Sequence, residues 1–374
     1  MADKRRGRAV GFGVLIAVLS LPLGYLVLTI LQAAIDLLWV YAPSKLPTVG
    51  LVGVALVVPT LAGVAVAWLR SGADGHNPMF GIALKPVTGQ QYPWVIGAIA
   101  ATLVGGLVLG PEVAMVSTGA FVGTEIASRS RAMDVTRGAT VGALFAILAL
   151  FVGPSLGGTF SVSPDYTFDW RDLVGSVGVA AVTTGAIALG RFLSIGVLRL
   201  HGGDRPRTVV LASAGFLVGA LALGYTLGTG NEISLVLTSG EHEVKPLLAL
   251  GTAGAIGLTV AIKWLAYSLS MGGGFRGGPF FPAIFIGAGI GAIATTVTPD
   301  YANAAAVAGM TAAVIYLAHP TWAVTLALGI VLGLLVGGPE LIPLAVAAAA
   351  VAKLIPGVRD STKPTGAQTI KEVR

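Results

Sequence analysis

The stretch that decides the fold is residues 110–119, which read GPEVAMVSTG and are followed by Gly123. Residues 278–287 read GPFFPAIFIG and are followed by Gly291. The two stretches share proline at relative position 2 and glycine at relative positions 1, 10 and 14, at an offset of 168 residues. This match predicts that the chain contains two copies of one structural unit.

A second pair of motifs supports the repeat. Residues 153–156 read GPSL and residues 319–322 read HPTW, so a proline recurs at an offset of 166 residues. Two landmarks at nearly one offset favour two homologous halves, and chance matching in a chain with 53 glycines is the alternative. Internal repeats are common in secondary transporters, whose substrate sites lie near the bilayer midplane where half-helices of the two repeats meet.

The composition indicates a membrane protein. Of 374 residues, 55% are hydrophobic and 11% are charged, far below the roughly 25% charged residues of a soluble domain. Mean hydropathy is +0.86, and apolar stretches of about 20 residues, long enough to cross a bilayer, recur from Gly11 to Lys353. The net charge of +6 is scattered over loops and both ends, so lipid headgroups are favoured as partners and nucleic acid is not.

Chemistry that needs thiols or clustered ligands is disfavoured. The chain has no cysteine, and its four histidines are isolated, so we expect no disulfide, no metal site and no cofactor. An intramembrane enzyme would need a nucleophile with a base, paired carboxylates or a metal cluster within the spans. The sequence has none of these, so we expect that the protein is not an enzyme.

The chain divides into three parts. Residues 1–8 form a basic cytoplasmic N-terminus, residues 9–354 form a single transmembrane domain, and residues 355–374 form a polar tail. The approximate halves of the membrane domain are residues 9–200 and 208–354. Basic residues before the first apolar run place the N-terminus in the cytoplasm, which predicts a multi-pass protein of the cell inner membrane (plasma membrane).

The expected fold class is an all-α polytopic membrane protein with two inverted homologous halves. Several predicted helices are short for a perpendicular span, and glycine and proline interrupt them, so we expect broken and tilted helices. The predicted helices cover residues 9–40, 50–69, 93–109, 112–127, 139–157, 173–197, 208–228, 246–270, 280–297, 304–318, 321–336 and 340–354.

The repeated motifs predict an anion site. In each motif Gly-Pro comes directly before an apolar helix, and proline suits the first helical turn. Helix N-termini carry unpaired N–H groups and partial positive charge, so two that converge in the membrane bind an anion without a full charge. Such binding is weak enough for release.

Glu112 lies at one of these N-termini between apolar residues. The helix N-terminus favours the carboxylate and the apolar surroundings favour the neutral acid, so both forms are accessible. An ionised Glu112 would compete with a bound anion, and a protonated Glu112 would vacate the site. This predicts a gate or a proton carrier. A simple helix cap is the alternative.

These motifs resemble those of the CLC family of chloride channels and chloride–proton antiporters. Residues 109–112 (LGPE), followed by Gly119, resemble the family motif that bears the gating glutamate. Residues 277–282 (GGPFFP) resemble the Gly-Gly-x-Phe-x-Pro motif of the second half. The proline landmarks also resemble family positions, with matching order and spacing over residues 50–350.

The resemblance implies that Glu112 is the external gate. It also implies an anion path lined by the Phe280 side chain and by the backbone around Phe280 and Phe281, with Gly110 and Val113 on the other motif. The protein would then be a homodimer with one pore in each subunit, either a voltage-gated chloride channel or an antiporter of chloride and protons.

Several positions depart from the family pattern. Residues 74–78 (DGHNP) replace the serine motif of the inner gate, so Asn77 or the N–H groups of Gly75 and His76 could bind the anion, and a solvated loop tip is an equal reading. Pro279 has no N–H to offer. No tyrosine follows Tyr316, so the family's inner-gate tyrosine is absent.

The sequence also leaves the residues of an inner proton path undecided. After Pro154 no glutamate occurs where exchangers carry a proton-transferring glutamate, and Asp165 is either its substitute or a loop aspartate. Lys263 and Arg191 lie in apolar stretches, and we expect them to snorkel to the interface. Arg276 is expected to attract anions to the pore mouth, and Glu340 to lie in an interfacial loop.

An inverted-repeat transporter for another ion or an organic solute is the competing function. Cation carriers usually need more than one membrane carboxylate, and only Glu112 and, less clearly, Glu125 qualify. Within the anion hypothesis the sequence leaves channel and exchanger open, and also the choice among chloride, nitrate and fluoride.

Overall fold

The structure is a computed structural model that describes residues 2–80, 84–130, 133–152, 166–200, 206–297 and 302–356. These residues are helical or in loops, and the only strand-like pairing among them is an isolated bridge between Gly110 and Gly278. The principal helices are α1 (Ala2–Asp36), α2 (Thr48–Leu69), α3 (Tyr92–Val104), α4 (Glu112–Ser128), α5 (Val135–Ile147), α6 (Ala149–Val152), α8 (Arg171–Arg199), α9 (Arg207–Thr229), α10 (Val244–Leu248), α11 (Ala253–Gly272), α12 (Phe280–Val297), α13 (Ala302–Ala318), α14 (Trp322–Gly337) and α15 (Ile342–Leu354).

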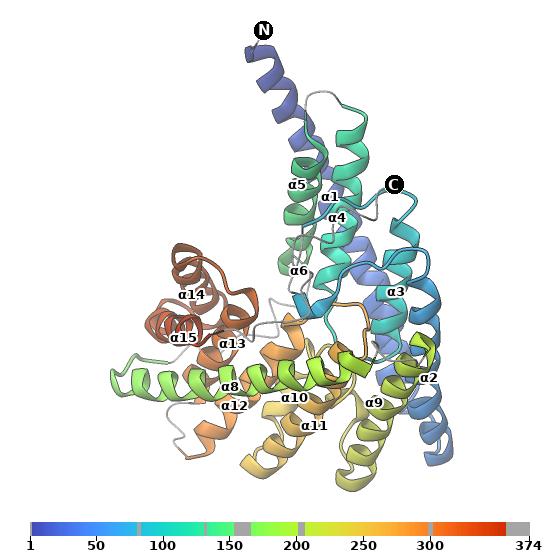
Figure 1. The fold of residues 1–374 in the computed structure, drawn as a ribbon. Helices are drawn as coiled ribbons and strands as arrows, with labels where there is room; N and C mark the ends of the chain where they lie inside the picture. The colour runs from blue at the N-terminus through green and yellow to red at the C-terminus, as the bar shows by residue number, and fades with distance from the viewer. Residues whose placement is uncertain are drawn as a thin grey trace.

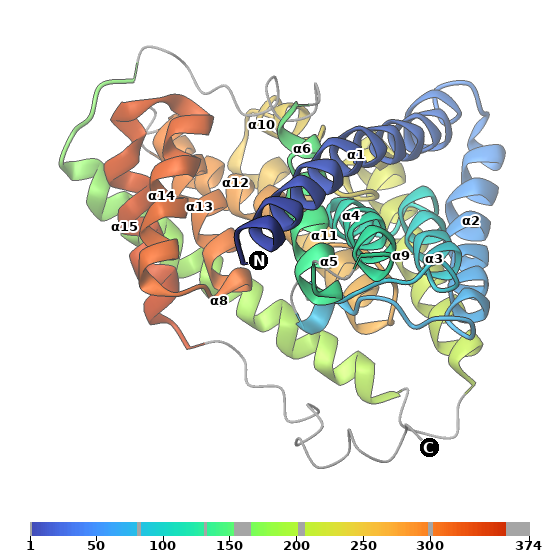
Figure 2. The same cartoon turned by 90° about the horizontal axis from the view of Figure 1, so that it is seen from above.

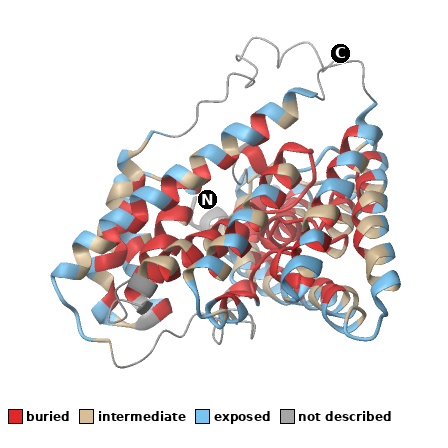
Figure 3. Ribbon diagram, turned by 90° about the horizontal axis from the view of Figure 1, so that it is seen from below, coloured by how far each residue is buried: buried red, intermediate tan, exposed pale blue. Residues whose placement is uncertain are grey.

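The predicted all-α membrane fold is confirmed. Five helices of the described chain are long and apolar enough to cross a bilayer, and they cover residues 9–41, 48–69, 171–199, 207–229 and 253–272. Buried residues concentrate where helices meet in the middle of the molecule, and the outer helices present exposed residues (Figure 3). Many of these exposed residues are large and apolar, as a surface in contact with lipid requires.

The ends of the predicted domain are only partly described. The expected basic segment 1–8 is continuous with α1 from Ala2 onward. The first helix is therefore longer than predicted. Of the expected tail 355–374, only Ile355 and Pro356 lie within the described residues.

The two halves are inverted relative to each other. Helix α4 runs from the middle of the molecule toward the side where the N-terminus lies, and α12 runs the opposite way (Figure 1). Seen from above, α2, α3 and α9 lie at one end of the molecule and α13, α14 and α15 at the other (Figure 2).

The repeated glycines hold equivalent helix pairs together. A Cβ atom added at Gly119 on α4 would collide with the carbonyl oxygen of Gly142 on α5, and one added at Gly287 on α12 would collide with that of Gly309 on α13. Gly123 and Gly291 lie against the next helix in the same way. Glycine at relative positions 10 and 14 therefore lets two backbones touch, which is how small residues join helices in membranes.

Broken helices occur as expected, but three further predicted helices differ from those in the structure. Helix α3 ends at Val104 rather than at residue 109, because Gly106 takes a left-handed φ of 77° that glycine adopts without strain. Gly274 has a φ of 88° at the equivalent point before α12.

The predicted helix 246–270 is two helices, α10 and α11, with Gly251 at a φ of 71° between them. The predicted helix 139–157 is likewise two, α5 and α6, and residues 153–165, with the landmark Pro154, lie outside the described residues.

The glycine contacts give a direct test. Gly119→Ala should lower the stability of the protein by about 1–3 kcal/mol, because the new methyl group would force α4 and α5 apart. Gly224→Ala is the matched control on α9, since a Cβ there meets nothing within 4 Å. Thermal unfolding in detergent, followed by size-exclusion chromatography, should show a lower midpoint for Gly119→Ala alone. Equal midpoints would contradict the packing role.

Candidate functional site

The two halves meet at a reciprocal backbone contact. The N–H of Gly110 donates to the carbonyl oxygen of Gly278 at 2.7 Å, and the N–H of Gly278 donates to that of Gly110, also at 2.7 Å. Each glycine stands directly before the proline that precedes α4 or α12. The contact therefore holds the two helix N-termini beside each other.

A second pair of hydrogen bonds repeats this symmetry. The N–H of Val108 donates to the hydroxyl of Ser270 on α11 at 3.0 Å, and the N–H of Arg276 donates to the hydroxyl of Thr102 on α3 at 3.2 Å. Donors and acceptors are related by the same offset of 168 residues. A side-chain hydroxyl of each half thus accepts a hydrogen bond from a buried N–H of the other half, and buried backbone groups need such partners.

The Glu112 carboxylate reaches across this junction. Glu112 begins α4, its side chain is buried, and its Oε1 accepts a hydrogen bond of 2.7 Å from the N–H of Phe280, the first residue of α12. Its Oε2 is also buried, with no hydrogen-bond partner among the described residues. A Cβ at Gly110 or Gly278 would occupy the space of this carboxylate, so the two glycines make room for it.

This arrangement has a clear chemical capacity. The carboxylate is an anion at an N–H donor of the opposite helix, where the end of a helix favours negative charge. A small anion would compete for the same donor. Protonation removes the charge of Glu112, and the N–H of Phe280 then becomes available to another acceptor.

The structure brings some predicted residues together and separates others. Val113 and Phe281 are buried beside Glu112 and Phe280, on the first turns of α4 and α12. The N–H of Gly110 is engaged by Gly278, so it is not open to an anion in this structure.

Tyr267 is a residue of this junction that the sequence analysis missed. Its buried hydroxyl donates to the carbonyl oxygen of Pro279 at 3.0 Å and fixes the loop that leads into α12. Its equivalent in the first half is Ile99, so the repeat offered no signal. Asp165, the candidate for an inner proton path, lies outside the described residues.

The loop at residues 73–77 lies apart from Glu112. Gly75 and His76 line a cavity of about 200 Å³, whose far wall is formed by α4 one turn beyond Glu112. Asn77 is not part of this lining, and its side-chain oxygen accepts a hydrogen bond from the N–H of Met79. The residues that line the cavity are Ala73, Asp74, Gly75, His76, Lys85, Pro86, Val87, Gln91, Val95, Val116, Ser117 and Ala120.

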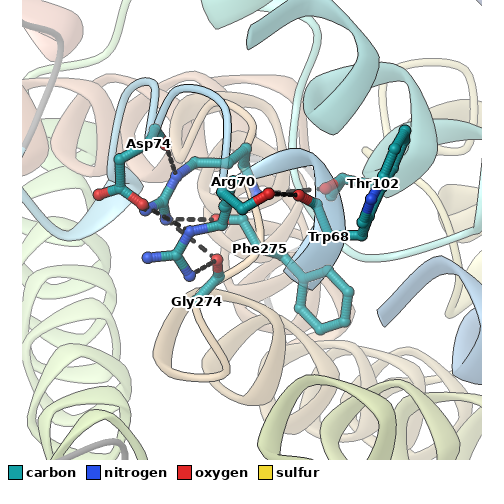
Figure 4. Close-up of polar contacts among 8 residues, drawn as sticks. Trp68, Arg70, Asp74, Thr102, Gly274 and Phe275 are labelled. Atoms are coloured by element: carbon teal, nitrogen blue, oxygen red, sulfur yellow. Dashed lines mark hydrogen bonds and ion pairs between the residues drawn. The ribbon is translucent and has the colours of Figure 1, made fainter. Parts of the chain in front are cut away.

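Arg276 does not lie at a pore mouth, and that prediction is wrong. Its side chain is 1% exposed and is bonded to Asp74 of the first half. Figure 4 shows Asp74 together with Arg70 and Gly274. It forms an ion pair with Asp74 at 2.9 Å and donates to the backbone oxygens of Asp74, Gly274 and Phe275. Arg70 also binds both Asp74 and Gly274. We call this group, Arg70, Asp74 and Arg276 with the Gly274 carbonyl, the clasp.

The clasp determines the state of the Asp74 carboxyl. Partial burial acts to raise the pKa of Asp74, but the positive charges of Arg276 and Arg70 outweigh this effect and hold that pKa below its ordinary value. Asp74 is therefore ionised at neutral pH. The loop at residues 73–77 is consequently tied to the second half, and it is not a freely solvated tip.

Lys263 does not snorkel to the interface, so that prediction is also wrong. Its side chain is fully buried, and its ammonium donates to the carbonyl oxygens of Leu235, Val236 and Leu237 at 2.9–3.3 Å. The half-buried Arg191 donates to the carbonyl oxygen of Met79 at 2.9 Å. Both basic side chains are thus satisfied inside the protein.

Comparisons with known proteins agree with this architecture. A family model described as voltage gated chloride channel matches residues 54–357. YfeO of Escherichia coli O139:H28 (strain E24377A / ETEC), a protein named for ion transport, is 27% identical over 327 residues, covering 71% of this chain and 73% of YfeO.

Two solved structures share the fold. One is the crystal structure of a slow cyanobacterial Cl⁻/H⁺ antiporter, with a TM-score of 0.68 and 17% identity, covering 92% of both chains. The other is a eukaryotic CLC transporter, with a TM-score of 0.60 and 14% identity, covering 92% of this chain and 71% of that one.

The clasp predicts that replacing Arg276 lowers the stability of the protein much more than replacing Arg129. Arg276→Met should destabilise the protein by at least about 2 kcal/mol, because the carbonyls of Asp74 and Phe275 lose a donor inside the protein. Arg129→Met is the control, since Arg129 is 81% exposed and pairs with Glu125 at 3.4 Å on the surface, where such pairs contribute at most about 1 kcal/mol. Thermal unfolding in detergent measures both, and similar midpoints would argue against the clasp.

Proposed function

The chain belongs to the voltage-gated chloride channel (CLC) family, and on that premise we propose that it carries a small inorganic anion, chloride first of all, across the membrane through a pathway gated by Glu112. The observation that carries the proposal is the hydrogen bond between the Glu112 carboxylate and the N–H of Phe280. An anionic side chain there occupies a donor that a transported anion needs.

The gate works by exchange of one anion for another. With Glu112 ionised, its carboxylate holds the N-terminus of α12 and excludes chloride. When Glu112 takes up a proton, the N–H of Phe280 is freed and chloride binds between the two helix ends. Loss of the proton returns the carboxylate and expels the chloride. The same cycle serves a passive channel or a chloride–proton exchanger.

The site attracts an anion without holding it too strongly. The buried basic residues that precede α12 in the sequence are Lys263 and Arg276. The Lys263 ammonium donates to a backbone oxygen, and the Arg276 guanidinium is bonded to Asp74. The anion would therefore be held by helix ends and N–H groups, which suits rapid release.

The pathway belongs to a single subunit. Glu112 and Phe280 come from the two halves of one chain, so each chain carries a complete site. A homodimer would then contain two independent pores. We place the protein in the cell inner membrane, with its basic N-terminal end in the cytoplasm, since basic residues flanking a span stay on that side.

The function is tested by measuring chloride and proton flux together from proteoliposomes at a set membrane potential. Glu112→Gln mimics the protonated gate, so chloride flux should continue with a flat pH dependence, and any coupled proton flux should fall to the level of protein-free liposomes. Glu340→Gln is the matched control, because Glu340 follows the same Gly-Pro pair at residues 338–339 but is exposed, and it should behave as the native protein.

The outcomes separate the alternatives. Coupled proton movement in the native protein identifies an exchanger, and chloride flux without protons identifies a passive pathway. Native pH dependence in Glu112→Gln would remove Glu112 from the mechanism. Equal flux of chloride and gluconate would favour a transporter for organic solutes instead.

A further inference from the structure

The two halves differ at equivalent positions beside α4 and α12. The offset of 168 residues maps Val95 onto Lys263, Ser117 onto Phe285 and Ala120 onto Ala288. In the first half these positions line the cavity of about 200 Å³. In the second half the side chains of Lys263 and Phe285, which are larger than Val95 and Ser117, occupy the equivalent region.

The cavity of the first half has mixed polar and apolar walls and is large enough to hold water. Its polar lining residues are Asp74, His76, Lys85, Gln91 and Ser117, and Lys85 is exposed. Its volume is far above the roughly 10–15 Å³ that one water molecule needs. Val116, one of its lining residues, lies one helical turn from Glu112.

The charge of the cavity wall favours an anion. Asp74 is its one acidic lining residue, and Arg70 and Arg276 pair with that carboxylate. Lys85 adds a further positive charge. The charged lining residues, Asp74 and Lys85, cancel, and Arg70 and Arg276 behind Asp74 add two positive charges. A small inorganic anion entering the cavity therefore meets net positive surroundings, which raise its local concentration.

The equivalent region of the second half is filled. The ammonium of Lys263 lies 4.6 Å from the centroid of the Phe285 ring, and both side chains are fully buried. A Cβ added at Gly240 would lie 2.9 Å from Phe285 and 3.0 Å from Lys263, so the adjoining loop is packed against them. We call Lys263 and Phe285 the plug.

The plug is held by hydrogen bonds as well as by packing. Three carbonyl oxygens, those of Leu235, Val236 and Leu237, hold the ammonium of Lys263. Helix α11 has 20 residues, whereas α3 has 13, so helix replaces the loop that borders the cavity in the first half.

The cavity and the plug lie on opposite sides of the junction, because α4 and α12 run in opposite directions from it (Figure 1). We infer that the cavity is a one-sided access route, which leads small inorganic anions to Glu112 from the side of the N-terminus, and that the plug closes the equivalent route from the other side. This inference rests on the proposed function, and it makes Lys85 a recruiting residue and Lys263 a sealing residue.

The chain has no cysteine, so single cysteines report access without background. Ala120→Cys and Ala288→Cys form a matched pair, because the two alanines are related by the repeat, and Ala120 lines the cavity whereas Ala288 lies beside the plug. The probe is the anionic, membrane-impermeant thiol reagent MTSES, applied to inside-out and to right-side-out vesicles. Modification is read by mass spectrometry, which does not depend on transport.

We expect Ala120→Cys to be modified from the side of the N-terminus only, at least tenfold faster than Ala288→Cys from either side. Lys85→Glu should slow the reaction with MTSES about tenfold and leave the reaction with the cationic reagent MTSET equal or faster. Ser117→Cys is the second reporter if Ala120→Cys does not fold.

The plug is tested by exchanging side chains at equivalent positions between the two halves. Lys263→Val with Phe285→Ser should open the second half, so that Ala288→Cys becomes reactive from the side opposite the N-terminus. Val95→Lys with Ser117→Phe should protect Ala120→Cys.

Equal reactivity of Ala120→Cys and Ala288→Cys, or reactivity of Ala120→Cys from both sides, would overturn the inference. Labelling as expected without any chloride flux would retain the access route and reject the proposed function, so the two failures are distinguishable.

Discussion

The reciprocal hydrogen bonds between Gly110 and Gly278 are the constraint on which the rest of the structure depends. They oblige two inverted half-helices to begin at one point inside the protein. The flanking bonds from Val108 to Ser270 and from Arg276 to Thr102 satisfy the backbone that must cross there. Without these bonds two broken helices would leave buried N–H groups unpaired, a cost that a bilayer does not relieve.

Departures from symmetry at this junction pair an acid of one half with a donor of the other. One helix begins with Glu112 and the other with Phe280, so only one N-terminus carries an acid and the other supplies its N–H donor. Arg276 extends the asymmetry, because its equivalent, Val108, makes no clasp. A perfectly symmetric pair of helix ends would lack the acid on which the proposed gate rests.

Patterns that are local and repeated in the sequence predicted the structure correctly. Gly-Pro before an apolar run predicted the starts of α4 and α12, and the shared glycines predicted two halves. The predictions for Lys263 and Arg276 were wrong, because a basic residue in an apolar stretch gives no sign of the carbonyl oxygens that will surround it. Those oxygens belong to distant loops, such as residues 235–237.

The sequence by itself determined that this protein lies in a membrane, that it is built from two related helical halves, and that Glu112 begins a helix. Only the tertiary structure decided that the Glu112 carboxylate binds the N-terminus of the opposite helix, and that the first half keeps a cavity where the second is filled. The physical reason is the distance along the sequence over which each feature is determined. Helix starts and hydropathy depend on neighbouring residues, whereas a hydrogen bond between residues 168 positions apart depends on how the two halves cross.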